Sequence, residues 1–289
     1  MRLALTNDDG VGSPGIHELA SACHRLGHDV VIAAPEDDSS GSSAAIGRIR
    51  ADQRIESRSV VLPDAPKIDA HAVSGPPGLA VLAACLGAFG EPPDAVVSGI
   101  NAGPNTGHAI LHSGTVGAAL TAASFGVSAL AISLDVGDTS PWETATAFVE
   151  PALELLRKAP DGTVLNVNVP ALPLTDVPSE LRWAKLDRFG SVRVAVADVG
   201  DRWVQMEYRT TDTELDPDSD TALLAGGAAT VTCLEGIVAV DLDELGRRAD
   251  RGDRLTAFLR ELRGSARPRT VHVDKDESRS VSPPTSPTE

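Results

Sequence analysis

Short apolar runs alternate with segments of helical periodicity along the first 170 residues, and this alternation constrains the fold most. The runs expected to form strands are residues 3–5, 30–34, 94–98, 129–133 and 164–169. The segments expected to form helices are residues 16–26, 79–88, 115–124 and 142–158. Parallel strands joined by crossover helices form a sheet with helices on both faces. The sequence therefore predicts an α/β fold with a doubly wound, mostly parallel sheet.

The composition is consistent with this kind of core. Aromatic residues make up only 3% of the chain and hydrophobic residues 42%, so the interior must be built from Val, Leu, Ile and Ala. Such small aliphatic side chains are typical of a buried parallel sheet flanked by helices. A chain of 289 residues can hold one substantial core with an appended segment. Residues 48–69 show no firm period, and their structure is left undecided.

The composition changes after Pro170, where turn-forming and acidic residues become frequent. Between Asp198 and Asp220, eight Asp or Glu residues stand against two Arg residues. The tail contains Arg-Pro, Ser-Pro and Pro-Pro sequence with little apolar surface to bury, which favours disorder. The expected divisions are residues 1–170 as the α/β catalytic core, 171–264 as a C-terminal extension with a strand-containing arm and a terminal helix near 255–262, and 265–289 as a disordered tail.

The net charge and the cysteine content limit the classes of partner and the cellular compartments that suit this chain. The net charge of −16 argues against a nucleic-acid polymer or an anionic membrane as main partner, because both require a basic surface. The three cysteines lie far apart, which excludes a disulfide framework and a Cys-x-x-Cys metal site and fits a reducing compartment. The chain starts with a strand rather than a leader, and no apolar run approaches the roughly 20 residues of a membrane span. We therefore expect a cytoplasmic protein.

Polar residues follow three of the predicted strands. Asn7, Asp8 and Asp9 end the first strand, Ser40 follows the second, and Asn101 follows the strand over 94–98. Adjacent carboxylates repel each other unless a cation or hydrogen-bond donors compensate, although such residues also form ordinary turns. Ligands of doubly wound sheets bind beyond the carboxyl ends of the strands. Oxygen donors without His or thiolate suit Mg²⁺, Mn²⁺ or Ca²⁺ better than Zn²⁺.

A glycine- and asparagine-rich loop over residues 99–113 leads into the helix expected from Thr115. Backbone N–H groups at a helix start bind anions, so a phosphate could rest there. Alternatively, Ser113 or Thr115 only caps the helix and the glycines only turn the chain. His108 and His112 could relay a proton to a leaving group, although an exposed loop histidine needs no catalytic role. Neither this loop nor the loop after the first strand has the sequence pattern of a Walker A loop or a dinucleotide-binding loop.

Four sequence blocks together resemble the SurE family of 5′/3′-nucleotidases. They occur in the family's order and at compatible spacing over about residues 1–170. The blocks are Leu5-Thr6-Asn7-Asp8-Asp9-Gly10-Val11 with Pro14-Gly15-Ile16, Ala34-Pro35 with Ser40-Gly41, Ser98-Gly99-Ile100-Asn101-Ala102-Gly103-Pro104-Asn105, and Ser113-Gly114-Thr115-Val116.

This resemblance implies a Rossmann-like core and a phosphomonoesterase that hydrolyses nucleoside monophosphates to nucleoside and phosphate with one Mg²⁺ or Mn²⁺ per subunit. It also implies homodimers or homotetramers joined through the C-terminal extension. Carried over by position, the metal ligands are Asp8, Asp9, Ser40 and Asn101. The catalytic residues implied are Asp8, Asp9 and Asn7. The residues expected to line the phosphate pocket are Asn7, Asn105, Ser113, Gly114 and Thr115.

The sequence departs from the family pattern around these positions. Ala109 stands where an acidic residue is typical, and Thr121 where Glu is usual. The usual Gly-Thr-Pro-Ala-Asp-Cys-Val block appears as Gly75-Pro76-Pro77-Gly78-Leu79-Ala80-Val81. A second hypothesis is therefore a metal- and nucleotide-binding protein of the same fold with weak or no turnover. A glycosyl- or acyl-transfer hydrolase has less support, because the chain has no Gly-x-Ser-x-Gly elbow.

Overall fold

The computed structural model describes residues 1–50, 52, 54–63, 65–135, 141–188, 190, 192–210 and 214–237. These residues belong to one compact unit, Met1–Ile237. The terminal helix expected near residues 255–262 and the tail expected from residue 265 lie outside the described residues. No helix in the described ranges is long and apolar enough to span a bilayer.

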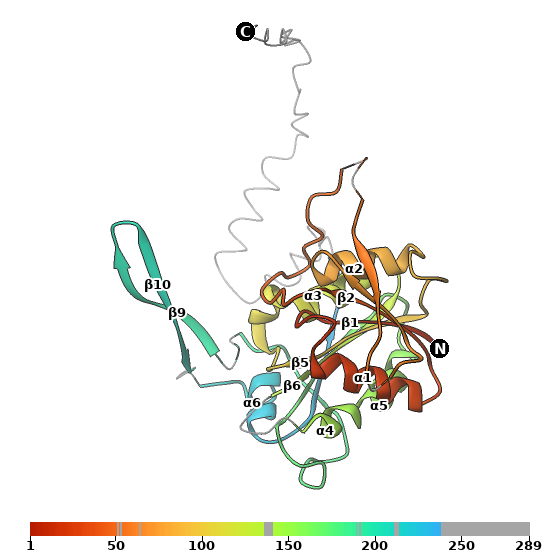
Figure 1. Ribbon diagram of the computed structural model, residues 1–289. Coiled ribbons are helices and arrows are strands. Elements are labelled where there is room, and N and C mark those ends of the chain that lie inside the picture. The colour runs from red at the N-terminus through yellow and green to blue at the C-terminus, as the bar shows by residue number, and fades with distance from the viewer. Residues whose placement is uncertain are drawn as a thin grey trace, which may run out of the picture. The chain divides into compact units, whose positions relative to one another are not determined.

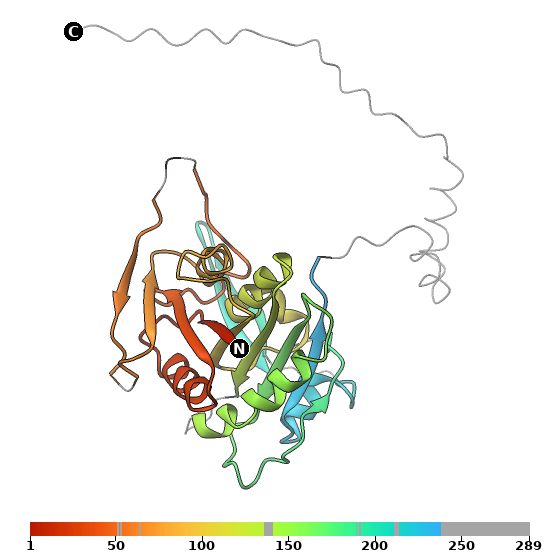
Figure 2. The same ribbon diagram turned by 90° about the vertical axis from the view of Figure 1, so that its right-hand side faces the viewer.

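A nine-stranded sheet forms the centre of this unit (Figure 1). Its strand order is β3-β4-β2-β1-β5-β6-β7-β11-β8. The six strands from β4 to β7 pair in parallel, and Figure 2 shows them side by side. Strands β3 and β11 run antiparallel to their neighbours β4 and β7. The strands are β1 (Arg2–Thr6), β2 (Asp29–Pro35), β3 (Ser57–Val60), β4 (Asp69–Val73), β5 (Ala95–Ala102), β6 (Ser128–Leu134), β7 (Val164–Val169), β8 (Arg182–Trp183) and β11 (Thr230–Leu234). The expected α/β fold with a mostly parallel sheet is confirmed.

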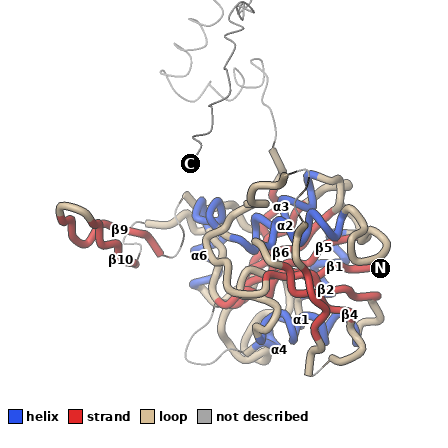
Figure 3. Tube along the Cα trace, turned by 45° about the horizontal axis from the view of Figure 1, so that its top comes forward, coloured by secondary structure: helices blue, strands red, loops and turns tan. Residues whose placement is uncertain are grey.

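Helices cover both faces of the sheet, as Figure 3 shows for α2 and α3 on one side and α1 and α4 on the other. Successive strand residues point to opposite faces, so Leu3 and Leu5 pack in the core with α1, whereas Ala4 packs with α2 and α3. The helices are α1 (Pro14–Arg25), α2 (Pro77–Cys85), α3 (Gly114–Ser124), α4 (Trp142–Thr146), α5 (Val149–Leu156) and α6 (Asp220–Ala225). Each face thus has its own cluster of buried aliphatic side chains.

The single helix expected over residues 142–158 is wrong, because the structure has two helices, α4 and α5. Pro151 accounts for the break. Proline has no N–H, and its ring collides with the carbonyl of the residue four positions earlier in a continuous helix. A helix that restarts at Val149 places Pro151 in its first turn, where both problems disappear.

Two further segments differ from expectation. The loop expected over residues 99–113 contains the last residues of β5 and a 3-10 helix, η1 (Gly107–His112). The undecided stretch over residues 48–69 contains β3, and β4 then joins the sheet between β3 and β2, with His71 opposite Ala33. Pairing with β2 explains why a strand as polar as Asp-Ala-His-Ala-Val forms here.

The chain after Pro170 contributes both to the main sheet and to a separate hairpin. Strands β9 (Val192–Gly200) and β10 (Trp203–Thr210) form a two-stranded antiparallel sheet. The chain then forms α6 and returns as β11, which pairs with β7. The expected boundary at residue 170 therefore divides a single sheet.

The position of β1 determines where a ligand can bind. It pairs with β2 on one side and β5 on the other, so the loops that follow β1 and β5 lead away on opposite sides of the sheet. In an open α/β sheet this switch in strand order opens a crevice at the carboxyl ends of the strands. Asn7, Asp8 and Asp9 lie at that point.

Candidate metal and phosphate site

Asn7 is fully buried at the end of β1 and is fixed by its own loop. Its Nδ2 donates hydrogen bonds to the carbonyl oxygen of Gly10 at 3.0 Å and to Ser13 Oγ at 2.7 Å. Its Oδ1 has no hydrogen-bond partner among the described residues. Because a buried amide oxygen without a partner is costly, this atom suggests that a cation or a hydrogen-bond donor from a ligand completes the site.

Asp8 connects the loop after β1 with two other segments. Its Oδ1 accepts a hydrogen bond of 2.5 Å from Thr115 Oγ1, and its carbonyl oxygen accepts one of 2.7 Å from the N–H of Ser39. A Cβ added at Gly114 would lie 2.7 Å from Asp8 Oδ2, so only glycine permits this approach of α3. The orientation of the Asp8 carboxylate is therefore fixed by the start of α3.

Asp9 is half-buried beside Asp8, and its ionised form is destabilised there. Burial, followed by the neighbouring charges of Asp8 and Asp38, raises the pKa of Asp9 to about 6, while a hydrogen bond from the backbone of Ala102 lowers it in part. A bound divalent cation would remove this electrostatic cost. The bond to Ala102 also places Asp9 next to Asn101 near the end of β5.

Ser40 and Asn101 supply neutral oxygens from the other two strand ends. Asn101 Nδ2 donates to the carbonyl oxygen of Gly103 at 2.7 Å, so its Oδ1 is the atom that could ligate a cation. Ser40 is exposed and adjoins Ser39, which donates to Asp8. Hydrogen bonds from the hydroxyl and N–H of Ser40 hold the pKa of Asp38 below its usual range.

The donor set fits a hard divalent ion. Two carboxylates, an amide oxygen and a hydroxyl come from loops that share hydrogen bonds, and Mg²⁺ or Mn²⁺ prefers such ligands. Among the described residues, no group of three or more His, Cys, Asp or Glu side chains could hold a metal. Any metal at this site would therefore take part of its ligands from amide and hydroxyl oxygens, such as those of Asn101 and Ser40.

The start of α3 lies against Asp8 and could bind an anion. Ser113 Oγ accepts a hydrogen bond of 3.1 Å from the N–H of Val116, so this hydroxyl caps the helix, as the simpler alternative expected. The Thr115 hydroxyl is also committed, to Asp8. Phosphate binding would therefore depend on backbone N–H groups of this 11-residue helix, whose first turn has no partners for them within the helix.

Asn105 is held by residues that the sequence analysis did not identify. Its N–H donates to Asn168 Oδ1 at 2.7 Å, and its carbonyl oxygen accepts from Asn166 Nδ2 at 2.8 Å and Asn168 Nδ2 at 2.9 Å. Its Nδ2 donates to Ser133 Oγ at 2.8 Å. Two asparagines two positions apart in the otherwise apolar strand β7 were a usable signal, because they share one face of the strand.

His108 and His112 are exposed on η1. Neither imidazole forms a hydrogen bond or ion pair with another described residue. Their role in proton transfer stays a prediction without structural support.

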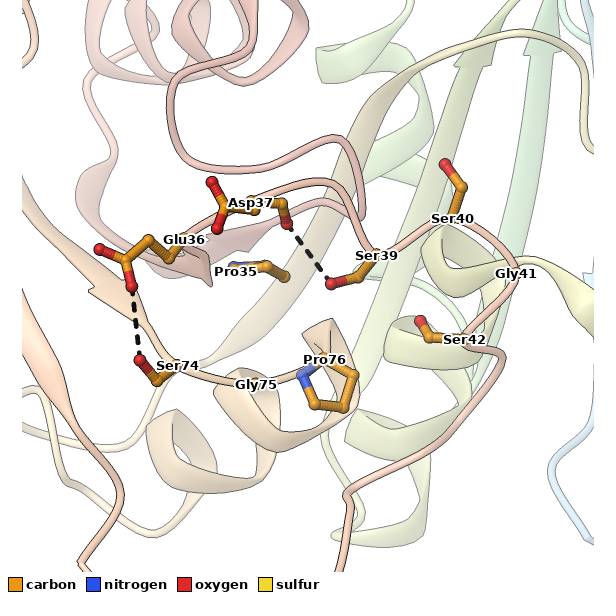
Figure 4. Close-up of a pocket in the computed structure, with 10 residues that line it drawn as sticks. All are labelled: Pro35, Glu36, Asp37, Ser39, Ser40, Gly41, Ser42, Ser74, Gly75 and Pro76. Carbon is orange, nitrogen blue, oxygen red and sulfur yellow. Dashed lines mark hydrogen bonds between the residues drawn. The ribbon is translucent and has the colours of Figure 1, made fainter.

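A pocket of about 530 Å³ adjoins the site (Figure 4). Glu36 and Ser74 lie at one end, and Ser40 and Ser42 at the other. Glu36 accepts hydrogen bonds from Arg58 at 2.8 Å and Ser74 at 3.4 Å. The lining residues are Pro35, Glu36, Asp37, Ser39, Ser40, Gly41, Ser42, Ser74, Gly75 and Pro76. Ser40, one of the expected metal ligands, also lines this pocket.

A known protein family matches the chain over most of its length. The family described as "Survival protein SurE" matches residues 3–191, which include every residue of the candidate site. The chain belongs to the SurE family. The resemblance carried by the four sequence blocks is thereby confirmed.

Known SurE proteins are similar to this chain over most of its length. The 5′-nucleotidase SurE of Gloeobacter violaceus is 33% identical over 243 residues, which cover 81% of this chain and 90% of the relative. The 5′/3′-nucleotidase SurE of Serratia proteamaculans is 33% identical over 251 residues, with coverage of 81% and 90%. The crystal structure of the SurE protein from Aquifex aeolicus superposes with a TM-score of 0.68 at 25% identity, covering 83% of this chain and 95% of that one.

The positions that depart from the SurE pattern lie outside the hydrogen bonds of Asp8 and Asp9. A Cβ added at Gly78 in α2 would lie 3.3 Å from Thr121 Oγ1 in α3, so two altered positions face each other. Thr121 donates to the carbonyl oxygen of Gly117 at 2.8 Å. Leu79 is buried, and Ala109 is exposed on η1. Gly78 and Thr121 thus lie in the packing between α2 and α3.

Proposed function

We propose that this SurE-family enzyme is a divalent-metal-dependent phosphomonoesterase that hydrolyses nucleoside monophosphates to nucleoside and inorganic phosphate. The observation that carries the proposal is the pair Asp8 and Asp9 at the switch point of the sheet, joined by hydrogen bonds to the start of α3 and the end of β5. The names of the relatives support 5′-nucleotidase activity.

The metal would be held by Asp8, Asp9, Asn101 and Ser40. When bound, Mg²⁺ or Mn²⁺ supplies charge neutralisation for the phosphoryl group and activation of water. The protein's own groups do the positioning: Thr115 orients Asp8, and the N–H groups at the start of α3 bind phosphoryl oxygens where negative charge develops. No covalent nucleophile is required by this arrangement.

The nucleoside part of the substrate would lie in the pocket beside Ser40. Pro35 and Pro76 provide apolar surface, and Glu36 and Ser74 provide oxygens for hydroxyl groups of a sugar. Pockets that combine apolar walls with a few polar groups are typical of small-molecule sites. The position of this pocket beside Ser40 supports a nucleotide, and not a smaller phosphate ester, as the substrate.

The competing hypothesis of binding without turnover is less well supported. It was motivated by the altered positions near the site, yet Gly78 and Thr121 lie between α2 and α3 and are not hydrogen-bonded to the carboxylates. A site that holds phosphate next to an activated water already contains what hydrolysis requires.

The test is hydrolysis of p-nitrophenyl phosphate by the purified chain in Mn²⁺. Asp8→Asn keeps an oxygen for the Thr115 hydroxyl but removes the charge, so activity should fall about 100-fold or more. Asp161→Asn, which changes an exposed carboxylate in the loop before β7, serves as a control and should leave the rate unchanged. Retained activity in Asp8→Asn, or activity that survives chelator, would refute the assignment.

The enzyme is also proposed to form a homodimer or homotetramer through the β9–β10 hairpin. Val194, Val196 and Met206 are more than half exposed, at 59%, 53% and 54%, in a sheet of only two strands. Isolated two-stranded hairpins are marginal in water, so a second copy of the chain is the partner that would bury this surface. A cytoplasmic location stays a prediction.

A further inference from the structure

Asp220, the first residue of α6, is a fully buried carboxylate with no part in the metal site. Its Oδ2 accepts a hydrogen bond of 2.9 Å from the N–H of Gly107. Its Oδ1 accepts bonds of 2.9 Å from the N–H of Asp187 and 2.8 Å from that of Thr221. Burial raises the pKa of Asp220, and these N–H groups oppose that shift. One side chain thus ties three separate stretches of backbone together.

Gly107 lies in the loop that carries the candidate phosphate residues. It is buried, begins η1, and has a left-handed φ of 59°. Thr106, the preceding residue, offers no side-chain cap to η1. The carboxylate of Asp220 therefore supplies the acceptor that this turn lacks within its own sequence, across 113 residues of chain.

The loop has a second anchor two residues earlier. Asn105 is held through its backbone by Asn166 and Asn168 of β7. The two anchors together fix the chain that runs from β5 to Gly114, where α3 meets Asp8. If either anchor is released, the start of α3 can move relative to Asp8.

We propose that Asp220 is a positioning residue for phosphoryl hydrolysis, which acts through Gly107 to hold the phosphate-binding loop against Asp8. This rests on the proposed function. The anchor comes from the segment after the β9–β10 hairpin, so residues 1–170 do not contain a complete active site.

Asp220→Asn tests this role with little change of shape. The asparagine oxygen can still accept from Asp187 and Thr221, but its Nδ2 then faces the N–H of Gly107, and two donors cannot bond. Displacement of a positioned group by about 1 Å can cost about 100-fold in rate. We expect kcat/KM for p-nitrophenyl phosphate in Mn²⁺ to fall about 10- to 100-fold, and the inhibition constant of inorganic phosphate to rise.

Asp218→Asn is the matched control. Asp218 lies two positions away and is exposed, and its carboxylate pairs with Lys185 at 3.4 Å, so the kcat/KM of this variant should stay within about twofold of that of the unmodified enzyme. A purely structural role of Asp220 would lower the amount of active enzyme, which reduces kcat and leaves KM and the phosphate inhibition constant unchanged. That result, or an unchanged kcat/KM in Asp220→Asn, would overturn the proposal.

Hydrogen exchange in the unmodified, metal-free protein gives a readout that needs neither activity nor a folded variant. The peptide that contains Gly107 should retain one amide more slowly exchanging than the exposed amides of η1. Rapid exchange throughout this peptide would also overturn the proposal. An inactive unmodified enzyme with a protected Gly107 would instead contradict the proposed function and leave the anchor in place.

Discussion

Asp9 shows how one residue combines a stability cost with a binding role. Its pKa of about 6, against a usual value of 3.8, means that ionisation is less favourable in the folded protein than in the unfolded chain. The destabilisation is absent below about pH 4, grows as the pH rises toward 6, and is constant above that value. A cation that binds the carboxylate converts this cost into affinity.

Asp9→Asn should therefore stabilise the metal-free protein at pH 8. After allowing for partial exposure the gain is about 1 kcal/mol, or about 2–4 °C in the unfolding midpoint. The difference from the unmodified protein should shrink as the pH falls from 6 to 4. Thermal unfolding in chelator from pH 4 to pH 8 measures this difference in midpoint, with Asp161→Asn as control. An equal or lower midpoint at pH 8 would show that Asp9 is not under this strain.

Residues were predictable from the sequence where the signal was local. Asp8 and Asp9 are adjacent and follow a strand directly. They belong to a motif that can be recognised in the sequence without knowledge of the fold. Asp220 carries a much weaker signal, because the run Asp220-Thr221-Ala222-Leu223-Leu224 only faintly resembles the family and Asp220 is one of eight acidic residues between positions 198 and 220. Its burial and its hydrogen bond from Gly107 distinguish it from exposed neighbours such as Asp218.

At the scale of elements, β7 acts as a support for the site as well as a core strand. Asn168 both donates to and accepts from the backbone of Asn105, whereas Asn166 only donates. Both side chains are fully buried, so substitution by alanine leaves similar cavities. The two residues therefore form a matched pair for measuring the backbone anchor.

Asn168→Ala should destabilise the protein more than Asn166→Ala. Asn168→Ala leaves the partly buried N–H of Asn105 without its acceptor, at a cost of about 2 kcal/mol. Asn166→Ala removes one of the two hydrogen bonds to the Asn105 carbonyl oxygen, at about 1 kcal/mol. Urea unfolding of the metal-free proteins measures both values. The reverse order would mean that the cavity, and not the hydrogen bonds, determines the cost.

If the pocket between the ends of β2 and β4 holds the nucleoside, filling it should raise the KM of a nucleotide more than the KM of a phosphate ester without a base. Ser74 is exposed at its rim, so Ser74→Phe should fill the pocket without disturbing the core. The KM for AMP should rise about tenfold, while that for glycerol phosphate changes less than about twofold. Ser59→Phe, on an exposed position of β3, is the control. Equal effects on both substrates would place the nucleoside elsewhere.

Elements were predictable where their pattern was regular. The order of helices and parallel strands up to β7 follows from apolar periodicity, but Pro151 divides an otherwise continuous helical pattern into α4 and α5. Strand β4 carries Asp69 and His71 and becomes a strand through its pairing with β2 on one side and β3 on the other. Such pairings join residues far apart in sequence, which periodicity within one segment cannot reveal.

At the scale of the whole molecule, the C-terminal part of the described chain is bound to the catalytic core. Strand β11 extends the sheet beyond β7, and α6 supplies the anchor for Gly107. The β9–β10 hairpin, which precedes both in the sequence, exposes the apolar residues proposed to join subunits. The proposed assembly surface and the proposed anchor for Gly107 therefore belong to neighbouring parts of the same segment.

Replacing Val196 with Lys and Met206 with Glu should weaken assembly. These residues face each other across the hairpin, so the new charges can pair and keep the strands together while removing the apolar surface. Light scattering after size-exclusion chromatography should show an oligomer for the unmodified chain and a shift toward the monomer for the double variant. Gln205→Lys, an exposed polar position in the same hairpin, is the control. A monomeric unmodified chain, or an unchanged mass, would contradict the assignment of this surface.

The central claim is that the carboxylate pair supports turnover of a nucleotide and not merely its binding. The most direct measurement follows phosphate release from a panel of nucleoside 5′-monophosphates in Mn²⁺, with calorimetric binding measured on the same sample. We predict release that stops with chelator, returns with excess Mn²⁺, and is lost in Asp8→Asn. Nucleotide binding without phosphate release, or release indifferent to chelator, would contradict the account.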